Sequence, residues 1–195
     1  VPEAVIIDVL FVHNGNIGKD QRGLWGGVII LGNASLNSNP GETAIEGIPT
    51  SETRGLYGGT DDTDNSGIFK YVSIRHGGTD IGEGNEINGL TMGGVGRGTT
   101  IEYAEVFSNQ DDGFEWFGGT VDCRNLIAAF CGDDAFDHDE GLTCRMQYLF
   151  VIQHAEFGNM CAEHDGAPKK ENLDADPKAY PVIYNATFLG SGQNS

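Results

Sequence analysis

Two stretches of the sequence repeat one pattern at a fixed interval. SNQDDGFEWFGG occupies Ser108–Gly119, and CGDDAFDHDEG occupies Cys131–Gly141. Each contains a pair of aspartates, then a small residue, a phenylalanine and another acid. Equivalent residues of the two stretches lie 22 positions apart, as Phe114 and Phe136 do. A repeat of about 20–50 residues indicates a solenoid, a propeller or another repeat array.

The segments around these stretches have the composition of short β-strands separated by Gly, Asp and Asn turns. Aligning the centres of five such segments gives successive offsets of 32, 22, 23 and 37 residues. The larger offsets indicate loops inserted at one corner of the repeat, and a further strand is expected at Ile87–Met92. The aligned centres are Val72–Ile74, Ala104–Val106, Leu126–Ala128, Leu149–Val151 and Ala186–Phe188.

No convincing long helix separates these strands, and parallel strands need a connection longer than a hairpin. A coil that closes one rung, with the next rung stacked about 4.8 Å above it, satisfies this requirement. We therefore predict an all-β fold, a right-handed parallel β-helix with about 22 residues per rung and corner insertions. An antiparallel β-sandwich is the alternative, because its turns recur at similar spacing. The β-helix is favoured because whole segments recur.

The composition limits the possible partners. The chain has 29 acidic and 11 basic residues, a net charge of −18, which argues against nucleic acid and anionic membranes. It suits a secreted surface protein or a cation binder. No apolar run approaches the roughly 18 residues of a membrane span. The chain starts at Val1 without a visible signal peptide, so we expect residues 1–195 to be a single β-helix domain from a longer chain.

The repeated acids are the first candidate site. Residues one rung apart lie over each other, so Asp112 and Asp134 would be about 5 Å apart. Such close carboxylates repel unless a cation or backbone N–H groups compensate. Each aspartate either caps its own turn or helps to bind calcium, which takes six to eight oxygen ligands. The candidate calcium ligands are Asp111, Asp112, Glu115, Asp133, Asp134, Asp137, Asp139, Glu163 and Asp165.

Histidines follow the same repeat. Strand alternation points the aspartates of FDHD, residues 136–139, to one face and His138 to the other. The stretch AEHDG at 162–166 repeats this arrangement. His138 and His164 would then stack near Trp116, where they either pack or bind a transition metal.

Four cysteines lie within a stretch of 39 residues. None forms a C-x-x-C pair, so neither a zinc ribbon nor a thioredoxin-type site is expected. We predict the disulfides Cys123–Cys144 and Cys131–Cys161, because each pair is separated by about one coil. Free buried thiols are the alternative.

Several blocks of the sequence resemble one family. They are WGGVIILGNASLN, IEGIP, YGGTDDTDNSGIFKYVSIRHGG, NEINGLTMGGVGRGTTIEYAEVFSNQDDGFEWFGGTV and DDAFDHDEG. They resemble secreted, often lipid-anchored β-helix proteins of marine Bacteroidetes-type bacteria, some of them cargo of type 9 secretion. The resemblance covers most of the chain from Trp25 to about Gly166. It implies a β-helix at an extracellular location, secreted or on the cell surface, and it implies no established reaction.

Three functions remain open. The favoured one is a structural or adhesive module, a surface rod or filament subunit that is stabilised by calcium and contacts other copies end to end. The second is non-catalytic binding of surface glycans, with Trp116, Phe117 and Tyr57 as stacking candidates. The third is a polysaccharide lyase or hydrolase. The G-H-G and R-x-K elements of such hydrolases are missing from the sequence and nothing singles out a catalytic base, so we name no catalytic residue.

Overall fold

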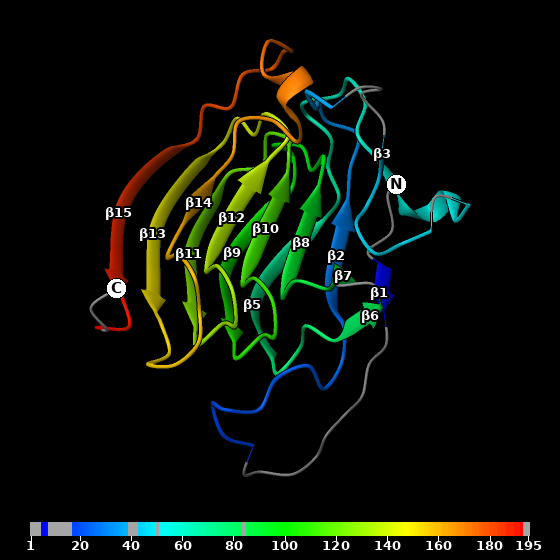
Figure 1. Ribbon diagram of the computed structural model, residues 1–195. Coiled ribbons are helices and arrows are strands. Elements are labelled where there is room, and N and C mark those ends of the chain that lie inside the picture. Colours follow the sequence, from blue (N-terminus) through cyan, green and yellow to red (C-terminus); the bar gives the residue numbers. More distant parts are fainter. Residues whose placement is uncertain (1–4, 8–16, 39–42, 50, 83–84, 193–195) are drawn as a thin grey trace.

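The regular secondary structure of the computed structural model is almost entirely β-strand, and the strands are wound into stacked coils (Figure 1). The structure describes residues 5–7, 17–38, 43–49, 51–82 and 85–192. Two short 3-10 turns are present, η1 at Thr53–Gly55 and η2 at Lys170–Asn172. The strands are β1 Val5–Ile7, β2 Gly27–Leu31, β3 Thr43–Ala44, β4 Leu56–Tyr57, β5 Ile68–Arg75, β6 Asp80–Gly82, β7 Asn85–Glu86, β8 Leu90–Gly93, β9 Thr100–Phe107, β10 Phe114–Phe117, β11 Cys123–Ala129, β12 Phe136–Asp139, β13 Arg145–Ile152, β14 Glu163–His164 and β15 Val182–Leu189.

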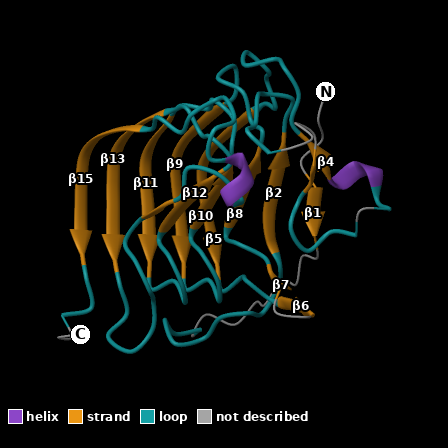
Figure 2. Cartoon of the chain, turned by 45° about the horizontal axis from the view of Figure 1, so that its top comes forward, coloured by secondary structure: helices purple, strands orange, loops and turns teal. Residues whose placement is uncertain are grey.

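Two sheets form the walls of the coil. The short-strand sheet has the order β1-β2-β8-β10-β12-β14, and the long-strand sheet has the order β15-β13-β11-β9-β5. From β8 onward the chain alternates between them, so each coil contributes one strand to each sheet (Figure 2). Apart from the antiparallel β1–β2 pair, the pairings in both sheets are parallel. The predicted parallel β-helix is confirmed, and its right-handed sense stays a prediction that follows from the general preference of parallel crossovers.

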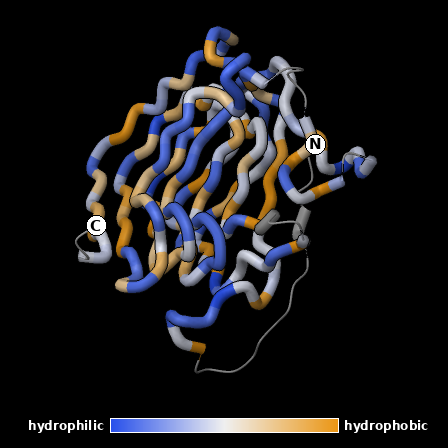
Figure 3. Tube along the Cα trace, viewed as in Figure 1, coloured by the Kyte–Doolittle hydropathy of each residue, from blue (hydrophilic) through white to orange (hydrophobic). Residues whose placement is uncertain are grey.

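The register agrees with the alignment of the sequence repeats. Ala104 pairs with Val72 on one side and with Leu126 on the other, and Leu126 pairs with Leu149. Ala104, Leu126 and Leu149 are buried inside the coil, and Val72 is half-buried on the edge strand β5. Ala186 pairs with Leu149 on the last strand. The core is therefore a stack of inward-pointing side chains with the predicted offsets. Figure 3 shows polar and apolar residues alternating along the coils.

Each long strand bends at one residue with a left-handed backbone. The φ angles at these bends lie between 54° and 60°. The register stacks the bends in one column, which consists of Tyr71, Tyr103, Asn125, Tyr148 and Asn185. Asparagine tolerates this conformation, whereas a bulky side chain rarely adopts it. The bend turns the chain so that one continuous strand covers two sides of the coil.

Extra residues are present at both expected places. Between β5 and β9 they include the antiparallel pair β6–β7, and the strand expected at Ile87–Met92 is β8, Leu90–Gly93. The sequence argument did not expect a third insertion, between β2 and β5. Residues 33–67 lie between β2 and β5, and part of this segment packs over the outer side of the short-strand sheet. The packing forms a second hydrophobic cluster, which consists of Ile29, Leu31, Leu36, Ile45, Tyr57 and Ile87. Residues 153–181 join β13 to β15 and contain β14 and η2.

Candidate cation site on the outer face of the short-strand sheet

The repeated acids stack as the sequence predicted. Phe114 pairs with Phe136, with ring centroids 5.3 Å apart inside the coil. One residue further on, Glu115 pairs with Asp137, and Asp137 pairs with Glu163. Because side chains alternate along a strand, these three acids form one column on the outer face. We call Glu115, Asp137 and Glu163 the carboxylate column.

The second aspartate of each Asp-Asp pair caps a turn of the next coil. The Oδ1 atom of Asp112 accepts a hydrogen bond from the backbone N–H of Asp134 at 2.9 Å. In the same way, Oδ1 of Asp134 accepts from the backbone N–H of Met160. Capping was one of the two expected roles, but the sequence argument placed it within the aspartate's own turn. The observed caps join successive coils instead.

Carboxylate oxygens converge in two overlapping groups. Asp111, Asp112 and Asp133 form one group, and Asp112, Glu115 and Asp137 form the other. In each group the ligand oxygens all lie within 4.8 Å of one another. Asp112 belongs to both groups and is 7% exposed, as is Glu115. Such a cluster offers the oxygen ligands that calcium prefers.

Burial and mutual repulsion raise the pKa values of this cluster. Burial, and then the charge of Asp111, raise the pKa of Asp112 to about 9. Burial and the charge of Asp112 hold the pKa of Glu115 well above its usual range. Burial and the charge of Glu163 raise the pKa of Asp137 to about 7. The cluster at neutral pH therefore needs protons or a cation to offset its repulsion.

The other predicted ligands lie outside the two oxygen groups. Asp134 acts as a cap, and burial, followed by its contact with Glu163, raises its pKa to about 7. Asp139 lies at the end of β12, where burial raises its pKa, and its side chain accepts a hydrogen bond from the N–H of Glu140 at 2.6 Å. Asp165 is exposed beyond β14. Five of the nine predicted ligands therefore converge.

Two residues of this face were missed by the sequence argument. The amide of Asn88, which is 3% exposed, donates a hydrogen bond to Oε2 of Glu115. The register places Asn88 one coil below Asp112, so NGL at 88–90 is a third copy of the DGF pattern. Glu140 is 6% exposed and accepts a hydrogen bond from the hydroxyl of Tyr57 at 2.9 Å. Burial raises the pKa of Glu140 to about 7.

The predicted stacking aromatics are not available on the surface. Trp116 is 1% exposed because it alternates with Glu115 and points into the coil. Tyr57 belongs to the 33–67 insertion and is 3% exposed, because this segment packs its side chain onto the short-strand sheet. Phe117 is half-buried and packs against Tyr57, with ring centroids 6.2 Å apart. The structure therefore does not support these residues as a glycan platform.

The predicted disulfides are not found, and all four cysteines are free thiols. The register gives the reason. Cys123 pairs with Met146, two residues beyond Cys144, and the pairing of Asp137 with Glu163 places Cys161 over Ala135, not over Cys131. Burial raises the pKa of Cys123 and of Cys131 to about 12, which keeps these thiols protonated.

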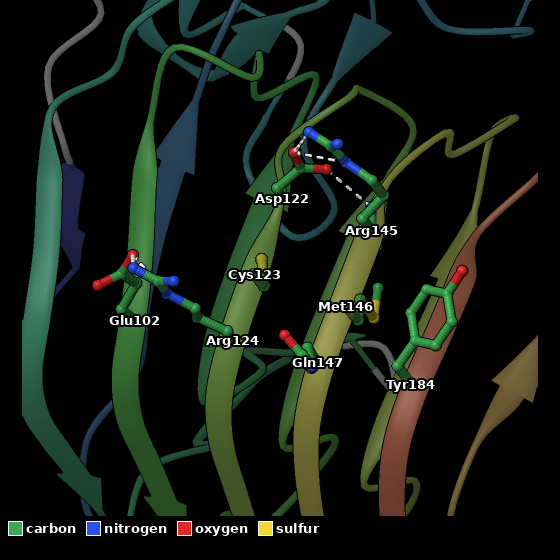
Figure 4. A pocket seen from close by; sticks show the side chains of 8 residues that line it. All are labelled: Glu102, Asp122, Cys123, Arg124, Arg145, Met146, Gln147 and Tyr184. Atoms are coloured by element: carbon green, nitrogen blue, oxygen red, sulfur yellow. Dashed lines mark hydrogen bonds and ion pairs between the residues drawn. The ribbon is translucent and has the colours of Figure 1, made fainter.

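A hollow lies on the outer face of the long-strand sheet (Figure 4). It has a volume of about 530 Å³, and its charged side chains are paired with one another. The guanidinium of Arg124 lies 2.6 Å from Glu102, and that of Arg145 contacts Asp122. These internal pairs leave little charge for a ligand, so the acidic face is the stronger candidate site.

These features define a parallel β-helix with a stacked carboxylate cluster on the outside of one sheet. The sequence matches the pectate-lyase-like β-helix domain family over residues 11–195, and the chain belongs to this family. No curated protein and no solved structure matches it. Among the described residues, no helix is long and apolar enough to span a membrane.

Proposed function

We propose that the chain is a calcium-stabilised β-helix module of an extracellular surface protein, with a structural or adhesive role. The convergence of Asp111, Asp112, Asp133, Glu115 and Asp137 carries the proposal. Calcium bound there would offset the repulsion between coils and tie two successive coils together. The net charge of −18 and the resemblance to secreted β-helix proteins support an extracellular location, secreted or at the cell surface.

Asp112 is the ligand with which to test calcium binding. Calcium that binds only the folded protein raises its stability by mass action, by about 2.7 kcal/mol at a concentration 100 times Kd. The variant Asp112→Asn keeps an oxygen that can cap Asp134 and loses the charge. We expect calcium to raise the Tm of the unmodified protein and to raise that of Asp112→Asn much less.

A matched control variant distinguishes the loss of calcium binding from a general effect of removing one negative charge. Glu102→Gln removes one carboxylate from the opposite sheet, where Glu102 is paired with Lys70 and Arg124. This variant should retain the full response to calcium. If isothermal titration detects no calcium binding to the unmodified protein, and a chelator leaves its Tm unchanged, capping alone explains the aspartates and the proposal fails.

End-to-end contact with other copies of the chain, the second part of the proposal, would use the last strand that the structure describes. β15 is the edge of the long-strand sheet. Phe188 pairs with Val151, which is buried, yet Phe188 is 41% exposed. Such an edge offers unpaired backbone groups and apolar surface to another strand. Sedimentation velocity should show concentration-dependent association, and Phe188→Lys should reduce it; a monomer at all concentrations argues against a filament role.

Glycan binding is the second candidate, with residues that differ from those expected. Tyr71 and Tyr103 stack with ring centroids 4.9 Å apart and are 76% and 44% exposed. The ammonium of Lys70 lies 5.6 Å from the Tyr71 ring centroid. This exposed aromatic surface suits stacking against sugar rings. Retardation in polysaccharide-containing gels that Tyr71→Ala and Tyr103→Ala both abolish would favour glycan binding; unchanged migration in every polysaccharide would exclude it.

A further inference from the structure

Side-chain rings stack along the coil in two columns, one inside and one outside. In the inner column His138 stacks on His164, with ring centroids 4.6 Å apart, as the sequence predicted, and Trp116 lies one coil below His138. His138 and Trp116 are 2% and 1% exposed, so they pack in the core. The outer column, in contrast, is open to solvent.

The outer column consists of the backbone bends of the long-strand sheet, and it carries tyrosines with one gap. Tyr71, Tyr103 and Tyr148 occupy the bends of β5, β9 and β13, and Asn125 occupies the bend of β11 between Tyr103 and Tyr148. Tyr71 and Tyr103 stack, with ring centroids 4.9 Å apart and ring planes 14° apart. The column is therefore a tyrosine ladder in which an asparagine replaces one ring.

A hollow occupies the place of the missing ring. Its volume is about 370 Å³, within the range of small-molecule sites, and it is open to solvent. Tyr103 and Tyr148, which are 44% and 50% exposed, line it on either side of Asn125. Ile127 and Phe150 add apolar surface beside the amide. A ligand can therefore reach both rings and the amide directly from solvent.

The spacing of the coils suits a single ring between the two tyrosines. Neighbouring strands lie about 4.8 Å apart, so Tyr103 and Tyr148, two coils apart, leave about 9.6 Å between their levels. A ring midway between them would lie about 4.8 Å from each. This spacing is close to the 4.9 Å that separates the stacked rings of Tyr71 and Tyr103. The hollow therefore admits one ring that packs against an aromatic face on each side.

The polar groups of the hollow favour a neutral ligand with hydroxyl groups. Among the described residues, the side-chain amide of Asn125 has no hydrogen-bond partner, whereas that of Asn185 accepts from Gln147 at 3.1 Å. The carboxylate of Glu105, which also lines the hollow, is already paired with Arg75 at 2.7 Å. The net charge of −18 disfavours an anionic ligand. A sugar ring combines an apolar face for the tyrosines with hydroxyl groups for the free amide.

We propose that this hollow binds one neutral sugar ring of a polysaccharide. The ring packs between Tyr103 and Tyr148, and its hydroxyl groups form hydrogen bonds with the amide of Asn125. The proposal rests on glycan binding, the second candidate function, and it places the sugar on the face of Tyr103 that is opposite to Tyr71. Tyr71 then supports the Tyr103 ring and does not itself contact the bound ring.

Filling the gap tests the site without weakening the fold. Asn125→Tyr places a ring where the sugar would bind, and Tyr71, Tyr103 and Tyr148 show that tyrosine adopts the left-handed bend in this column. Asn185→Tyr is the matched control, because it makes the same substitution at the same kind of bend, one coil beyond Tyr148 and outside the hollow. Both variants should keep the Tm and the response to calcium of the unmodified protein, so unfolding would not explain a loss of sugar binding.

The measurement is isothermal titration calorimetry with cellohexaose, xylohexaose and mannohexaose, and with hexagalacturonate as an anionic ligand, in a calcium-free buffer. We expect at least one neutral hexasaccharide to bind, with affinity at least about tenfold lower in Asn125→Tyr and Tyr148→Ala and unchanged in Asn185→Tyr. Asn125→Gly suits the left-handed bend, keeps the hollow open and removes the amide, so it should weaken binding less than Asn125→Tyr does. Hexagalacturonate should bind more weakly than the neutral sugar, because the protein is itself negatively charged.

Equal affinity in Asn125→Tyr and in the unmodified protein overturns the site. If Tyr71→Ala and Tyr103→Ala abolish binding in that case, the exposed tyrosine pair binds the glycan, and the second candidate function stands without this hollow. Stronger binding of hexagalacturonate overturns the choice of a neutral sugar. Absence of binding of all three neutral hexasaccharides also overturns the proposal, and the retardation in polysaccharide gels then decides separately whether the chain binds glycans elsewhere.

Discussion

The outer faces of the two sheets carry opposite arrangements of charge. On the short-strand sheet, Glu115, Asp137 and Glu163 form a column of one sign. On the long-strand sheet, Lys70, Glu102 and Arg124 form a column that alternates in sign. There the Lys70 ammonium and the Arg124 guanidinium lie 2.8 Å and 2.6 Å from the Glu102 carboxylate (Figure 4 shows the arginine pair).

The same stacking of coils has opposite consequences in the two columns. The hydrogen bond from Lys70 lowers the pKa of Glu102, with Arg124 adding to the effect. Burial and neighbouring acids raise the pKa of Glu115. The alternating column neutralises itself, whereas the carboxylate column needs protons or a cation. The charge pattern along the stack, and not the stacking itself, decides which face can take a ligand.

The largest expected difference is in the pH dependence of stability. Asp112 and Asp137 have folded-state pKa values of about 9 and about 7, above their ordinary value of 3.8. Between about pH 4 and pH 9 the folded protein therefore holds more protons than the unfolded chain, and its free energy of unfolding falls as the pH rises. The metal-free protein should melt at clearly lower temperature at pH 8.5 than at pH 5.5.

Calcium should reverse this trend by replacing the protons. The increase in Tm on adding calcium should be larger at pH 8.5 than at pH 5.5, and melting curves in chelator and in calcium at both pH values measure it. A metal-free protein whose Tm rises from pH 5.5 to pH 8.5 would show that the acids of the cluster are already compensated in the fold.

The next prediction is that removing one carboxylate changes the Tm in opposite directions in the two columns. In the metal-free protein at pH 8, Glu115→Gln should raise the Tm, because the amide avoids the cost of burying or protonating a carboxylate whose pKa is raised, and it keeps an oxygen for Asn88. A single unit of pKa shift corresponds to about 1.4 kcal/mol, or about 3–6 °C in a domain of this size. Glu102→Gln should lower the Tm by a smaller amount, since it leaves two cations facing each other. Equal shifts in both variants would remove the distinction between the columns.

The register of the carboxylate column could be predicted because a β-helix converts sequence spacing directly into stacking. The interval of 22 residues places Phe114 over Phe136 and Glu115 over Asp137, as observed. The same alternation of side chains points Trp116 inward, so its burial could also have been predicted from the sequence. The third copy of the pattern at Asn88 was harder to see, because an amide replaces the carboxylate.

The features that the sequence did not predict depend on backbone geometry that the repeat does not describe. Asp112 caps Asp134 of the next coil and not its own turn, and the spacing of residues does not reveal which N–H lies in reach. Tyr57 is buried because the 33–67 insertion packs onto the sheet, and no periodicity describes that packing. The cysteine pairing failed on register offsets of two residues for Cys123–Cys144 and four for Cys131–Cys161, which a count of residues per coil does not resolve.

The smallest change in Tm is expected from the exposed ion pair of Arg145 and Asp122 on the outer face of the long-strand sheet. The guanidinium of Arg145 contacts Asp122, and the backbone N–H of Arg145 donates to Oδ1 of Asp122 at 2.8 Å. The side chain of Arg145 is 74% exposed, so water screens the pair and ordering of the long side chain offsets the attraction. Arg145→Ala should change the Tm by no more than about 2 °C, and the difference should shrink further at 1 M salt. Asp122→Ala should have the larger effect, because it also removes the acceptor of the Arg145 N–H. Melting curves of the two variants and of the double variant measure the coupling between Arg145 and Asp122. The prediction fails if Arg145→Ala lowers the Tm by more than Glu102→Gln does and if this decrease does not depend on salt. The stability of this face would then depend on its ion pairs more than their exposure allows.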